Sequence, residues 1–395
     1  MLHIIHIIRD LDSASGGPSR SVPALAKSQA RLNGVSVTLL YQDRGNPVVP
    51  LTDDGVVYQS VAARDLLLAK NFLQYLPQQA VLEKTCVFHL HGLWSPTLHW
   101  VARFAARHDL PYVVSTRGML AGWCLAHKSF KKKLGWWLYQ KKDLQHASCL
   151  LASSETERQE VTALLPDHVV AVVPNGCDDR PADMPITPGV RKLPSARLAL
   201  AMGRLHPVKG FAELIEAWAT LRPVGWQLAI AGPDEDGYRA SLDELIRAHR
   251  LSDQVQLPGA LDDRQKWTWL DQCDLFVAPS KTENFGMAIA EAMLAGKPVI
   301  TTTGTPWECL PEIKAGWWVT PSPDALHMAL QEAMALTDVE RQAMGERARQ
   351  YAQRYAPDNI AHELVDIYRW LACGAERPAC VRLDYTPWGR GDGLI

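Results

Sequence analysis

Residues 274–298 read DLFVAPSKTENFGMAIAEAMLAGKP, and they predict a strand, a polar loop and a helix in succession. The apolar run 275–278 is typical of a buried parallel strand, which a Pro-Ser pair ends. Residues 287–295 are strong helix formers without a breaker, and Gly296 follows where a helix commonly ends. The apolar residues 299–303 predict a second strand, so the stretch indicates a strand–loop–helix–strand unit.

Gly286 precedes the expected helix, whose free backbone N–H groups and dipole favour an anion such as a phosphate. Glu283 lies before this helix and Glu291 lies inside it. A carboxylate repels a phosphate, so we expect both side chains to accept hydrogen bonds from hydroxyl groups. A ligand with phosphate in its middle and hydroxyl groups at both ends is a nucleotide sugar.

The pattern Glu-x7-Glu contains Phe-Gly, follows a strand that ends in Pro-Ser and precedes a helix that ends in Ala-Gly-x-Pro. It resembles the signature of family 4 of the retaining glycosyltransferases, which have the GT-B fold. Other matches extend from the N-terminal glycine loop to about residue 370. The resemblance implies an α/β protein of two doubly wound, Rossmann-like domains that face each other across a cleft.

Proline-rich residues 179–195 are the best candidate for a linker between these domains. We expect an N-terminal acceptor-side domain, a linker, a nucleotide-sugar-binding domain, a helix that crosses back to the first domain and a tail. Their expected ranges are 1–178, 179–195, 196–356, 357–373 and 374–395.

Composition excludes several other classes of protein. The 395 residues are 47% hydrophobic and carry a net charge of −2, so the chain shows no nucleic-acid footprint. Eight scattered cysteines without a Cys-x-x-Cys pair indicate reduced thiols in a cytoplasmic setting. There is no apolar run of about 18 residues to span a membrane, and the N-terminus reads as a strand and not as a signal peptide.

Arg204 and Lys209 follow an apolar strand over 196–202, and two cations beside a helix N-terminus can neutralise a diphosphate. Solvated loop charges are the alternative. The resemblance implies that both bind the donor diphosphate, that Glu283 holds hydroxyl groups of the donor sugar and that Glu291 holds the ribose. It implies a donor-binding set of Gly16, Gly17, Arg204, Lys209, Glu283, Asn284, Phe285, Gly286, Met287 and Glu291.

His91 ends a strand over 87–90, at the sheet edge where α/β proteins bind ligands. The resemblance implies that it contacts the donor sugar or its leaving phosphate, whereas a structural histidine is the alternative. The expected catalytic residues are therefore His91, Arg204, Lys209 and Glu283. His89 is a weaker candidate on the same strand.

Two arginines are candidates for the acceptor side. Arg20 lies one turn into the helix after the glycine loop, where it would add positive charge. Arg117 follows the strand 112–116, at a position where related members commonly have histidine. A guanidinium forks to carboxylate or phosphate, so Arg117 could bind an acidic or phosphorylated acceptor group; a satisfied surface arginine is the alternative.

Residues 128–142 combine six lysines with apolar residues at helical spacing. A basic helix with aromatic residues suits an anionic membrane surface. The alternative is that its apolar stripe, formed by Phe130, Leu134, Trp137 and Leu138, packs on the domain core. Farther along, Ser154 and Glu157 have the spacing of a helix capping box.

The resemblance predicts a retaining, metal-independent hexosyltransferase that moves sugar from a UDP- or GDP-linked donor to a hydroxyl of a glycan acceptor. We expect a polyprenyl-diphosphate-linked acceptor, a role in bacterial O-antigen or exopolysaccharide synthesis, and a cytoplasmic location, peripheral on the inner membrane face. No cofactor, metal or nucleic-acid partner is expected. The alternatives are a catalytically silent scaffold or binding protein with this fold, and a nucleotide-sugar hydrolase or epimerase.

Overall fold

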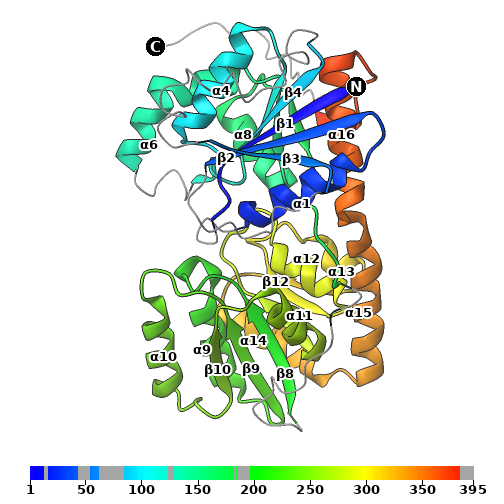
Figure 1. Cartoon of the computed structure of the whole chain (residues 1–395). Helices are drawn as coiled ribbons and strands as arrows, with labels where there is room; N and C mark the ends of the chain where they lie inside the picture. Colours follow the sequence, from blue (N-terminus) through cyan, green and yellow to red (C-terminus); the bar gives the residue numbers. More distant parts are fainter. Residues whose placement is uncertain are drawn as a thin grey trace, which may run out of the picture. The chain divides into compact units, whose positions relative to one another are not determined.

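The computed structural model describes residues 1–12, 17–42, 54–61, 84–122, 129–181, 184 and 196–382. The chain forms two compact units (Figure 1). Unit 1 comprises Met1–Gly176 and Pro357–Ile395, and unit 2 comprises Cys177–Ala356. Of the expected linker, only residues 179–181 and 184 belong to the described part, and residues 383–395 of the expected tail lie outside it.

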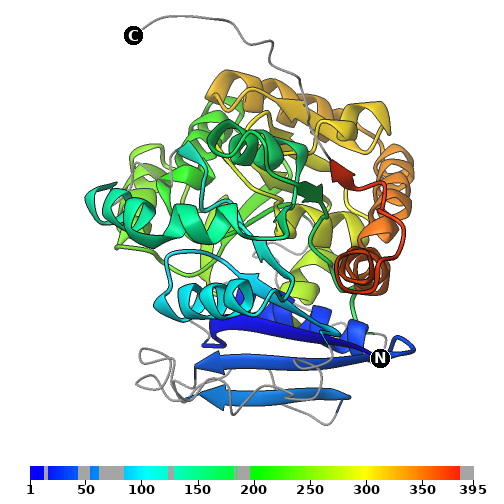
Figure 2. The same cartoon turned by 90° about the horizontal axis from the view of Figure 1, so that it is seen from above.

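Unit 1 is built on an eight-stranded sheet in the order β14-β7-β6-β5-β4-β1-β2-β3. In Figure 2 the blue arrows of β1, β2 and β3 lie side by side at one edge of it. Seven strands are parallel, and β14 pairs antiparallel with β7. The strands are β1 (Leu2–Asp10), β2 (Val35–Gln42), β3 (Val56–Val61), β4 (Cys86–His91), β5 (Tyr112–Ser115), β6 (Cys149–Ala152), β7 (Val170–Val172) and β14 (Val381–Arg382).

The apolar run at the start of the chain explains why this sheet is covered on both faces. Along β1, Ile5 and Ile7 point to one face and Ile4 points to the other, yet all three are buried, as in parallel sheets with helices on both sides. The helices of unit 1 are α1 (Pro18–Ala30), α4 (Pro96–Arg107), α6 (Ser129–Gly135), the π-helical turn η3 (Trp136–Gln140), α7 (Lys141–Gln145), α8 (Glu155–Leu164) and α16 (Pro357–Cys373).

Helix α16 follows the whole of unit 2 in the sequence but packs in unit 1, against α1. Its buried face, which includes Ile360, Leu364 and Tyr368, joins the apolar cluster around β1 and β2. The chain therefore leaves unit 1 after Gly176 and returns at Pro357. Past this helix, part of the expected tail forms strand β14.

Unit 2 is a six-stranded parallel sheet in the order β10-β9-β8-β11-β12-β13. Its strands are β8 (Arg197–Met202), β9 (Trp226–Ala231), β10 (Val255–Gly259), β11 (Leu275–Ala278), β12 (Val299–Thr302) and β13 (Gly316–Val319). Its helices are η4 (Pro207–Lys209), α9 (Phe211–Leu221), α10 (Tyr238–Ala248), α11 (Asp263–Gln272), α12 (Met287–Leu294), α13 (Cys309–Glu312), α14 (Pro323–Ala335), α15 (Asp338–Ala352) and η5 (Gln353–Tyr355).

Both sheets have the Rossmann strand order, in which the connections reverse direction beside the first strand. The reversal lies between β1 and β4 in unit 1 and between β8 and β11 in unit 2. In such sheets, ligands bind outside the carboxyl ends of the strands at this point. The expected α/β class with two doubly wound units is confirmed.

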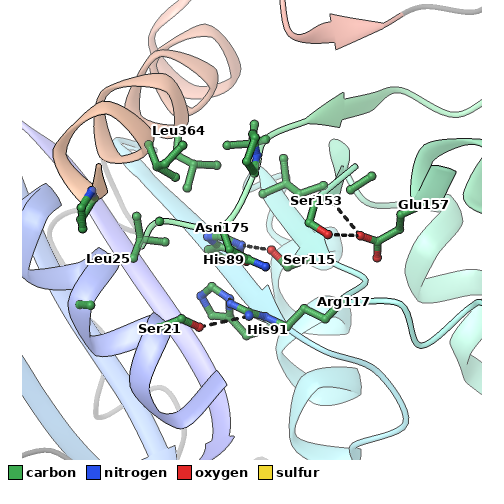
Figure 3. Close-up of a pocket in the computed structure, with 18 residues that line it drawn as sticks. Ser21, Leu25, His89, His91, Ser115, Arg117, Ser153, Glu157, Asn175 and Leu364 are labelled. Carbon is green, nitrogen blue, oxygen red and sulfur yellow. Dashed lines mark hydrogen bonds between the residues drawn. The ribbon is translucent and has the colours of Figure 1, made fainter. Parts of the chain in front are cut away.

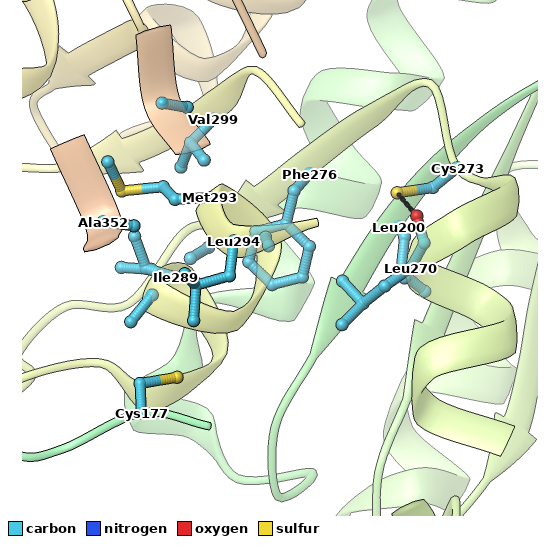
Figure 4. Close-up of a cluster of buried hydrophobic side chains, with 14 of the residues drawn as sticks. Cys177, Leu200, Leu270, Cys273, Phe276, Ile289, Met293, Leu294, Val299 and Ala352 are labelled. Carbon is cyan, nitrogen blue, oxygen red and sulfur yellow. Dashed lines mark hydrogen bonds between the residues drawn. The ribbon is translucent and has the colours of Figure 1, made fainter. Parts of the chain in front are cut away.

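A buried apolar cluster fixes α12 on the sheet of unit 2 (Figure 4). Phe276 of β11 packs there with Ile289 and Met293 of α12 and with Leu270 of α11. Each of these side chains is nearly inaccessible to solvent. Because α12 is held in this way, its N-terminus stays at the carboxyl end of β11.

The lysine- and tryptophan-rich segment has its apolar side chains on the outside. Leu134, Trp137 and Leu138 are 53%, 75% and 67% exposed, so the alternative that they pack on the core is wrong. The π-helical turn instead directs Trp136 and Gln140 inward, and Gln140 Oε1 accepts a 2.8 Å hydrogen bond from the backbone N–H of Trp94. Lys128 and the side chains of Phe130 and Lys131 lie outside the described part.

None of the helices in the described part of the chain is long and apolar enough to cross a membrane.

Candidate functional site

The loop that carries Lys209 is packed against the end of β11. Gly210 has φ +70°, and an added Cβ would lie 2.0 Å from the carbonyl oxygen of Pro279. Only glycine combines this left-handed conformation with such a close backbone approach. The two loops at the strand reversal of unit 2 therefore lie against each other.

Lys209 and Glu283 form an ion pair across these loops. The Lys209 ammonium donates to Glu283 Oε2, and Ser280 Oγ lies 3.3 Å from the same oxygen. The backbone N–H of Glu283 donates to the carbonyl of Gly304 over 2.7 Å, which fixes the loop. Both charged side chains keep part of their surface accessible, so a ligand can reach them.

Arg204 leaves the end of β8 and also has a carboxylate partner. Its Nη1 lies 2.6 Å from each carboxylate oxygen of Glu235. The arginine is 53% exposed, so water screens this pair and a ligand can compete for the guanidinium.

Glu291 is held by a residue that the sequence did not indicate. Lys266 Nζ donates to Glu291 Oε1 over 2.7 Å and lies 3.5 Å from Asp263. Burial alone would lower the pKa of the Lys266 ammonium, but the Glu291 carboxylate outweighs this and raises the pKa. A capping box of Asp262 and Gln265 fixes the start of α11 and with it Lys266.

The loop before α12 buries its aromatic side chain. Phe285 is buried with its ring 5.5 Å from that of Trp307, and its backbone carbonyl accepts from Trp307 Nε1, so its side chain does not face a ligand. Gly286 has φ +85°, where an added Cβ would lie 3.0 Å from Ile289 and 3.2 Å from Trp307. Asn284 and Met287 flank this turn in a partly accessible position.

The glycine loop of unit 1 is only partly described, because Gly16 lies outside the described residues. Gly17 begins α1 with φ −52°, a conformation open to any residue, and an added Cβ would contact nothing within 4 Å. Its conformation therefore does not require glycine. Arg20 is exposed on the first turn of the helix.

Unit 1 contains a pocket that is partly open to solvent (Figure 3). It lies at the carboxyl ends of β4 to β7, between α1 and α16. Its lining includes the apolar side chains of Leu25 and Leu364 and the polar side chains of Arg117, Ser153 and Asn175. The cavity thus combines apolar and polar walls.

His91 lies at the base of this cavity with both ring nitrogens engaged. Nε2 is 2.9 Å from His6 Nδ1, and Nδ1 is 3.1 Å from Arg117 Nη2. His6 continues the chain through a 2.6 Å hydrogen bond to Gln29 Oε1. His91 stays a predicted donor contact, but a new contact through its ring would require one of these bonds to be exchanged.

His89 has a structural environment. Its Nε2 is 2.7 Å from Ser115 Oγ, and its Nδ1 is 2.6 Å from the hydroxyl of Tyr368 on α16. Burial lowers the pKa of His6 to about 4 and the pKa values of His89 and His91 well below the ordinary value, and the charge of Arg117 acts in the same direction. All three imidazoles are therefore neutral at pH 7.

The ring nitrogens of these three histidines lie within 4.8 Å of one another, close enough for three ligands of one metal ion. Their ring nitrogens already have the protein partners given above. A guanidinium also adjoins the cluster, and its charge repels a metal cation. The donor set consequently does not fit a metal site in this arrangement.

Arg117 is half-buried and lines the cavity, which differs from the alternative of a satisfied surface arginine. Its Nη1 donates to Ser21 Oγ over 3.3 Å, and its buried Nε has no partner. Burial lowers the pKa of the guanidinium to about 10, an effect that Glu157 partly offsets. Arg117 therefore remains charged at neutral pH.

Glu157 is a second residue whose role the sequence only half indicated. Its backbone N–H donates to Ser154 Oγ, as expected at a helix start. Its carboxylate leaves the helix and accepts from Thr116 Oγ1 and Gly118 N, both at 2.5 Å, and from the backbone N–H and hydroxyl of Ser153. Glu157 thereby fixes the turn that carries Arg117.

Two family models match the chain in succession. The model described as a glycosyl transferase 4-like domain matches residues 16–176, and the model for glycosyl transferases group 1 matches residues 189–351. These ranges include most of unit 1 and most of unit 2, with the glutamates, Arg204 and Lys209 in the second.

Curated relatives of this chain are glycosyltransferases. The GDP-mannose:cellobiosyl-diphosphopolyprenol alpha-mannosyltransferase of Xanthomonas oryzae pv. oryzae (strain PXO99A) is 25% identical over 384 residues, which cover 93% of this chain and 96% of the relative. The D-inositol 3-phosphate glycosyltransferase of Jonesia denitrificans is 25% identical over 390 residues, covering 90% and 91%.

Solved structures share the fold. Sucrose-phosphate synthase from Thermosynechococcus elongatus superposes with a TM-score of 0.72 at 19% identity, covering 95% of this chain and all of that one. Anabaena HepE in complex with UDP and glucose superposes with a TM-score of 0.70 at 18% identity, covering 92% and 98%. The chain therefore belongs to the group 1, family 4-like glycosyltransferases, and it is a glycosyltransferase with the GT-B fold.

Proposed function

We propose that this enzyme transfers a sugar from a UDP- or GDP-linked donor to a hydroxyl of a glycan carried on a polyprenyl diphosphate, with retention of configuration and without a metal. One observation carries the proposal: Arg204, Lys209, Glu283 and Glu291 gather with the N-terminus of α12 around the strand reversal of unit 2. The bacterial pathway we infer is the assembly of O-antigen or exopolysaccharide.

The relatives support this choice of substrates. The Xanthomonas enzyme is named for GDP-mannose and a diphosphopolyprenol-linked acceptor, and the HepE structure contains UDP. Nucleotide sugars of either base have the diphosphate that the cations of unit 2 can bind. The donor sugar and the accepted glycan follow from the experiments below.

The proposed reaction makes one bond and breaks one. The acceptor hydroxyl oxygen bonds to the anomeric carbon on the face from which the diphosphate leaves, and its proton passes to the leaving phosphate oxygen. Arg204, Lys209 and the N–H groups at the start of α12 stabilise the charge that develops on the diphosphate. These groups supply positive charge in the place where a metal would otherwise be needed.

The two glutamates orient the donor in this proposal. Glu283 accepts hydrogen bonds from hydroxyl groups of the sugar, while Lys209 shares its three N–H donors between Glu283 and the diphosphate. Glu291 accepts from the ribose hydroxyls, with Lys266 holding one of its two carboxylate oxygens. Gly16, Gly17, Asn284, Phe285, Gly286 and Met287 provide backbone and edge contacts.

On the acceptor side, we place Arg20 and Arg117 of unit 1. The lipid carrier suggests a peripheral location on the inner face of the cytoplasmic membrane. The exposed residues Lys133, Leu134, Trp137, Leu138 and Lys142, here called the Lys/Trp surface, combine apolar side chains with basic ones. Such a surface suits the boundary of an anionic bilayer.

Nucleotide binding tests the donor site. Thermal unfolding is measured with UDP, GDP, ADP and CMP, with and without EDTA, on the wild type, Glu291→Ala and the exposed helix control Glu244→Ala. A nucleotide at about 100 times its Kd stabilises the protein by about 2.7 kcal/mol. We expect one nucleotide to act, EDTA to change nothing, and Glu291→Ala alone to weaken the response.

A transfer assay separates the proposal from its alternatives. The matched nucleotide sugar is supplied with and without polyprenyl-diphosphate glycans, and the product linkage is determined. Release or isomerisation of the sugar without acceptor would indicate a hydrolase or epimerase. Failure of every nucleotide to stabilise the protein would favour a scaffold and overturn the proposal.

Vesicle binding tests the membrane contact. We expect cosedimentation with phosphatidylglycerol vesicles and little with phosphatidylcholine, because the lysines are attracted to anionic lipid. The double variant Trp137→Ser, Leu138→Ser should bind less, whereas Val224→Ser, which removes an isolated exposed side chain of unit 2, should not. Equal binding by both variants would contradict the assignment.

A further inference from the structure

Arg117 places a positive charge in the cavity of unit 1 without a carboxylate partner. Its described partners are Ser21 Oγ and His91 Nδ1, both neutral, and its Nε is enclosed without a hydrogen bond. A buried charge is costly unless an opposite charge or several hydrogen bonds compensate it. The arrangement is therefore incomplete as it stands.

The nearest carboxylate does not complete it. The charge of Glu157 raises the pKa of the Arg117 guanidinium, while the Glu157 oxygens accept from Thr116, Gly118 and Ser153. Two of these donors flank Arg117 in the sequence, so Glu157 is used to shape the turn. The charge on Arg117 remains available for a ligand.

We propose that Arg117 is the centre of an oxyanion site that takes a carboxylate or phosphate group of the acceptor. The acceptor of this enzyme would then be an acidic or phosphorylated sugar, and neutral sugars would bind poorly. This inference depends on the proposed function in one respect: it identifies the ligand of this cavity as the acceptor.

A chain of hydrogen bonds, in which every donor points away from Arg117, holds the guanidinium in place. A guanidinium can only donate, so His91 Nδ1 must accept from Arg117. The Nε2–H of His91 then donates to His6 Nδ1, and the Nε2–H of His6 donates to Gln29 Oε1. Both histidines are thereby fixed as neutral tautomers that orient Arg117 without cancelling its charge.

The backbone supports the same reading. Arg117 has φ +51° and Gly118 has φ +68°, so two successive residues are left-handed. A left-handed conformation is disfavoured for arginine, and such residues cluster at ligand sites. Glu157 maintains this turn by bonding Thr116 on one side and Gly118 on the other. Glu157 and His91 are therefore positioning residues for Arg117.

The remaining cavity walls fit a sugar ring. Ser153 and Asn175 contribute polar side chains to the lining, and Leu25 of α1 and Leu364 of α16 contribute apolar ones (Figure 3). A pyranose has hydroxyl groups at its edge and C–H groups on its faces, so both kinds of wall would be used. An oxyanion on that ring would contact Nη1 and Nη2 of Arg117 together, as a bidentate pair.

Three sugars with one ring test the site: D-glucuronate, D-glucose 6-phosphate and D-glucose. Binding is measured by calorimetry on the full chain carrying Arg204→Ala and Lys209→Ala, which removes the other cations able to bind oxyanions. We expect at least one charged sugar to bind about tenfold or more tightly than glucose, which is the range for a charge-assisted bidentate contact. The charged sugar that binds identifies carboxylate or phosphate as the group.

The same measurement is repeated with Arg117→Gln and Arg117→Lys added. Arg117→Gln should reduce the preference for a charged sugar to within about threefold, whereas Arg117→Lys should retain part of it, because lysine keeps the charge but not the fork. Ser21→Ala, which removes only a neutral contact, should weaken charged-sugar binding by a few-fold. This milder variant keeps the test valid if a change at Arg117 disturbs folding.

Several outcomes would overturn the inference: glucose binding as tightly as both charged sugars, an undiminished preference in Arg117→Gln, or no binding by any of the three. A nucleotide that binds unit 2 should still raise the unfolding temperature of the single variant Arg117→Gln, and this shows that the variant is folded. If no nucleotide stabilises the wild type while a charged sugar binds through Arg117, the proposed function fails and the oxyanion site stands.

Discussion

The two units treat their functional charges in opposite ways. In unit 2, Arg204, Lys209 and Lys266 each contact a carboxylate, and two of those carboxylates belong to Glu283 and Glu291, which we propose bind the donor. In unit 1, Arg117 faces neutral histidines and a hydroxyl, and its described surroundings contain no ion pair with it. The units thus differ in the source of the negative charge: in unit 2 it comes from carboxylates of the protein, whereas in unit 1 we propose that it comes from the ligand.

Because of this difference, we expect the two sites to bind their ligands in different ways. A diphosphate entering unit 2 must share lysine and arginine with carboxylates that are already present, so binding there is an exchange of partners. An oxyanion entering unit 1 meets a cation that has no competitor, although it is enclosed. We expect unit 2 to depend on the pairs themselves and unit 1 to depend on keeping its histidines neutral.

The largest expected effect breaks an ion pair of unit 2. Lys209→Ala should lower kcat for transfer by about 10²- to 10³-fold, because it removes a charge that stabilises the leaving diphosphate. The matched control is Lys281→Ala, a lysine of the neighbouring loop that pairs with Glu213 at 2.5 Å. Steady-state kinetics on both variants make the comparison, and a loss below about tenfold in Lys209→Ala would remove Lys209 from the mechanism.

A smaller effect tests the neutrality of the histidines in unit 1. The folded protein holds the pKa of His6 at about 4, whereas an unfolded chain titrates near 6.5. The unfolded state therefore binds the proton first as the pH falls, so the stabilisation is complete above about pH 6.5 and is lost toward pH 4. Acidification from pH 7 to 5 should cost about 2 kcal/mol of unfolding free energy through His6.

Hydrogen exchange resolved by peptide measures this loss in each unit separately. Peptides of unit 1 should lose protection between pH 7 and 5, after correction for intrinsic exchange, and peptides of unit 2 should lose less. The variant His6→Asn, which does not titrate at this position, should reduce the pH dependence in unit 1, and His89 and His91 should account for what remains. An equal pH dependence in wild type and variant would show that His6 is not the group responsible.

The smallest expected effect concerns Lys266, the partner of Glu291 in unit 2. Lys266→Met should weaken nucleoside diphosphate binding by about tenfold. The substitution removes the hydrogen bond to Glu291 and leaves the carboxylate charge without its partner. Because the lysine acts through Glu291, the variant should also discriminate less between the ribonucleotide and its 2′,3′-dideoxy analogue. Calorimetry with both ligands measures this ratio.

Lys297→Met is the control, because this lysine of unit 2 donates to a backbone carbonyl, that of Asp271, at 2.9 Å. It should leave the ratio unchanged. The double variant Lys266→Met, Glu291→Ala should discriminate no less than Glu291→Ala alone. A further loss in the double variant would mean that Lys266 contacts the nucleotide directly.

Local signals in the sequence predicted much of the fold. The strand 275–278, the glycine turn at Gly286 and the helix that follows have their determinants within a few residues, and the structure has β11 and α12 there. The same holds for α16, whose apolar spacing indicated its buried face. Periodicity and turn chemistry act over short distances, so they can be read without tertiary structure.

The partners of the charged residues could not be read in this way. Lys266 reaches Glu291 across 25 residues, Lys209 reaches Glu283 across 74, and His6 reaches His91 across 85. Each of these pairs depends on strand order and on how a helix packs on its sheet. Likewise, a periodic stripe did not reveal that Trp137 and Leu138 point outward, because a π-helical turn changes the face.

The sequence by itself thus determined the two Rossmann-like units, the glutamates with their flanking loop and the two cations after β8, because spacing along the chain defines them. Only the tertiary structure decided that Arg117 is enclosed beside neutral histidines while the cations of unit 2 are paired. The physical reason is that charge compensation depends on distance through space, and parallel strands bring together at one sheet edge residues that the sequence keeps far apart.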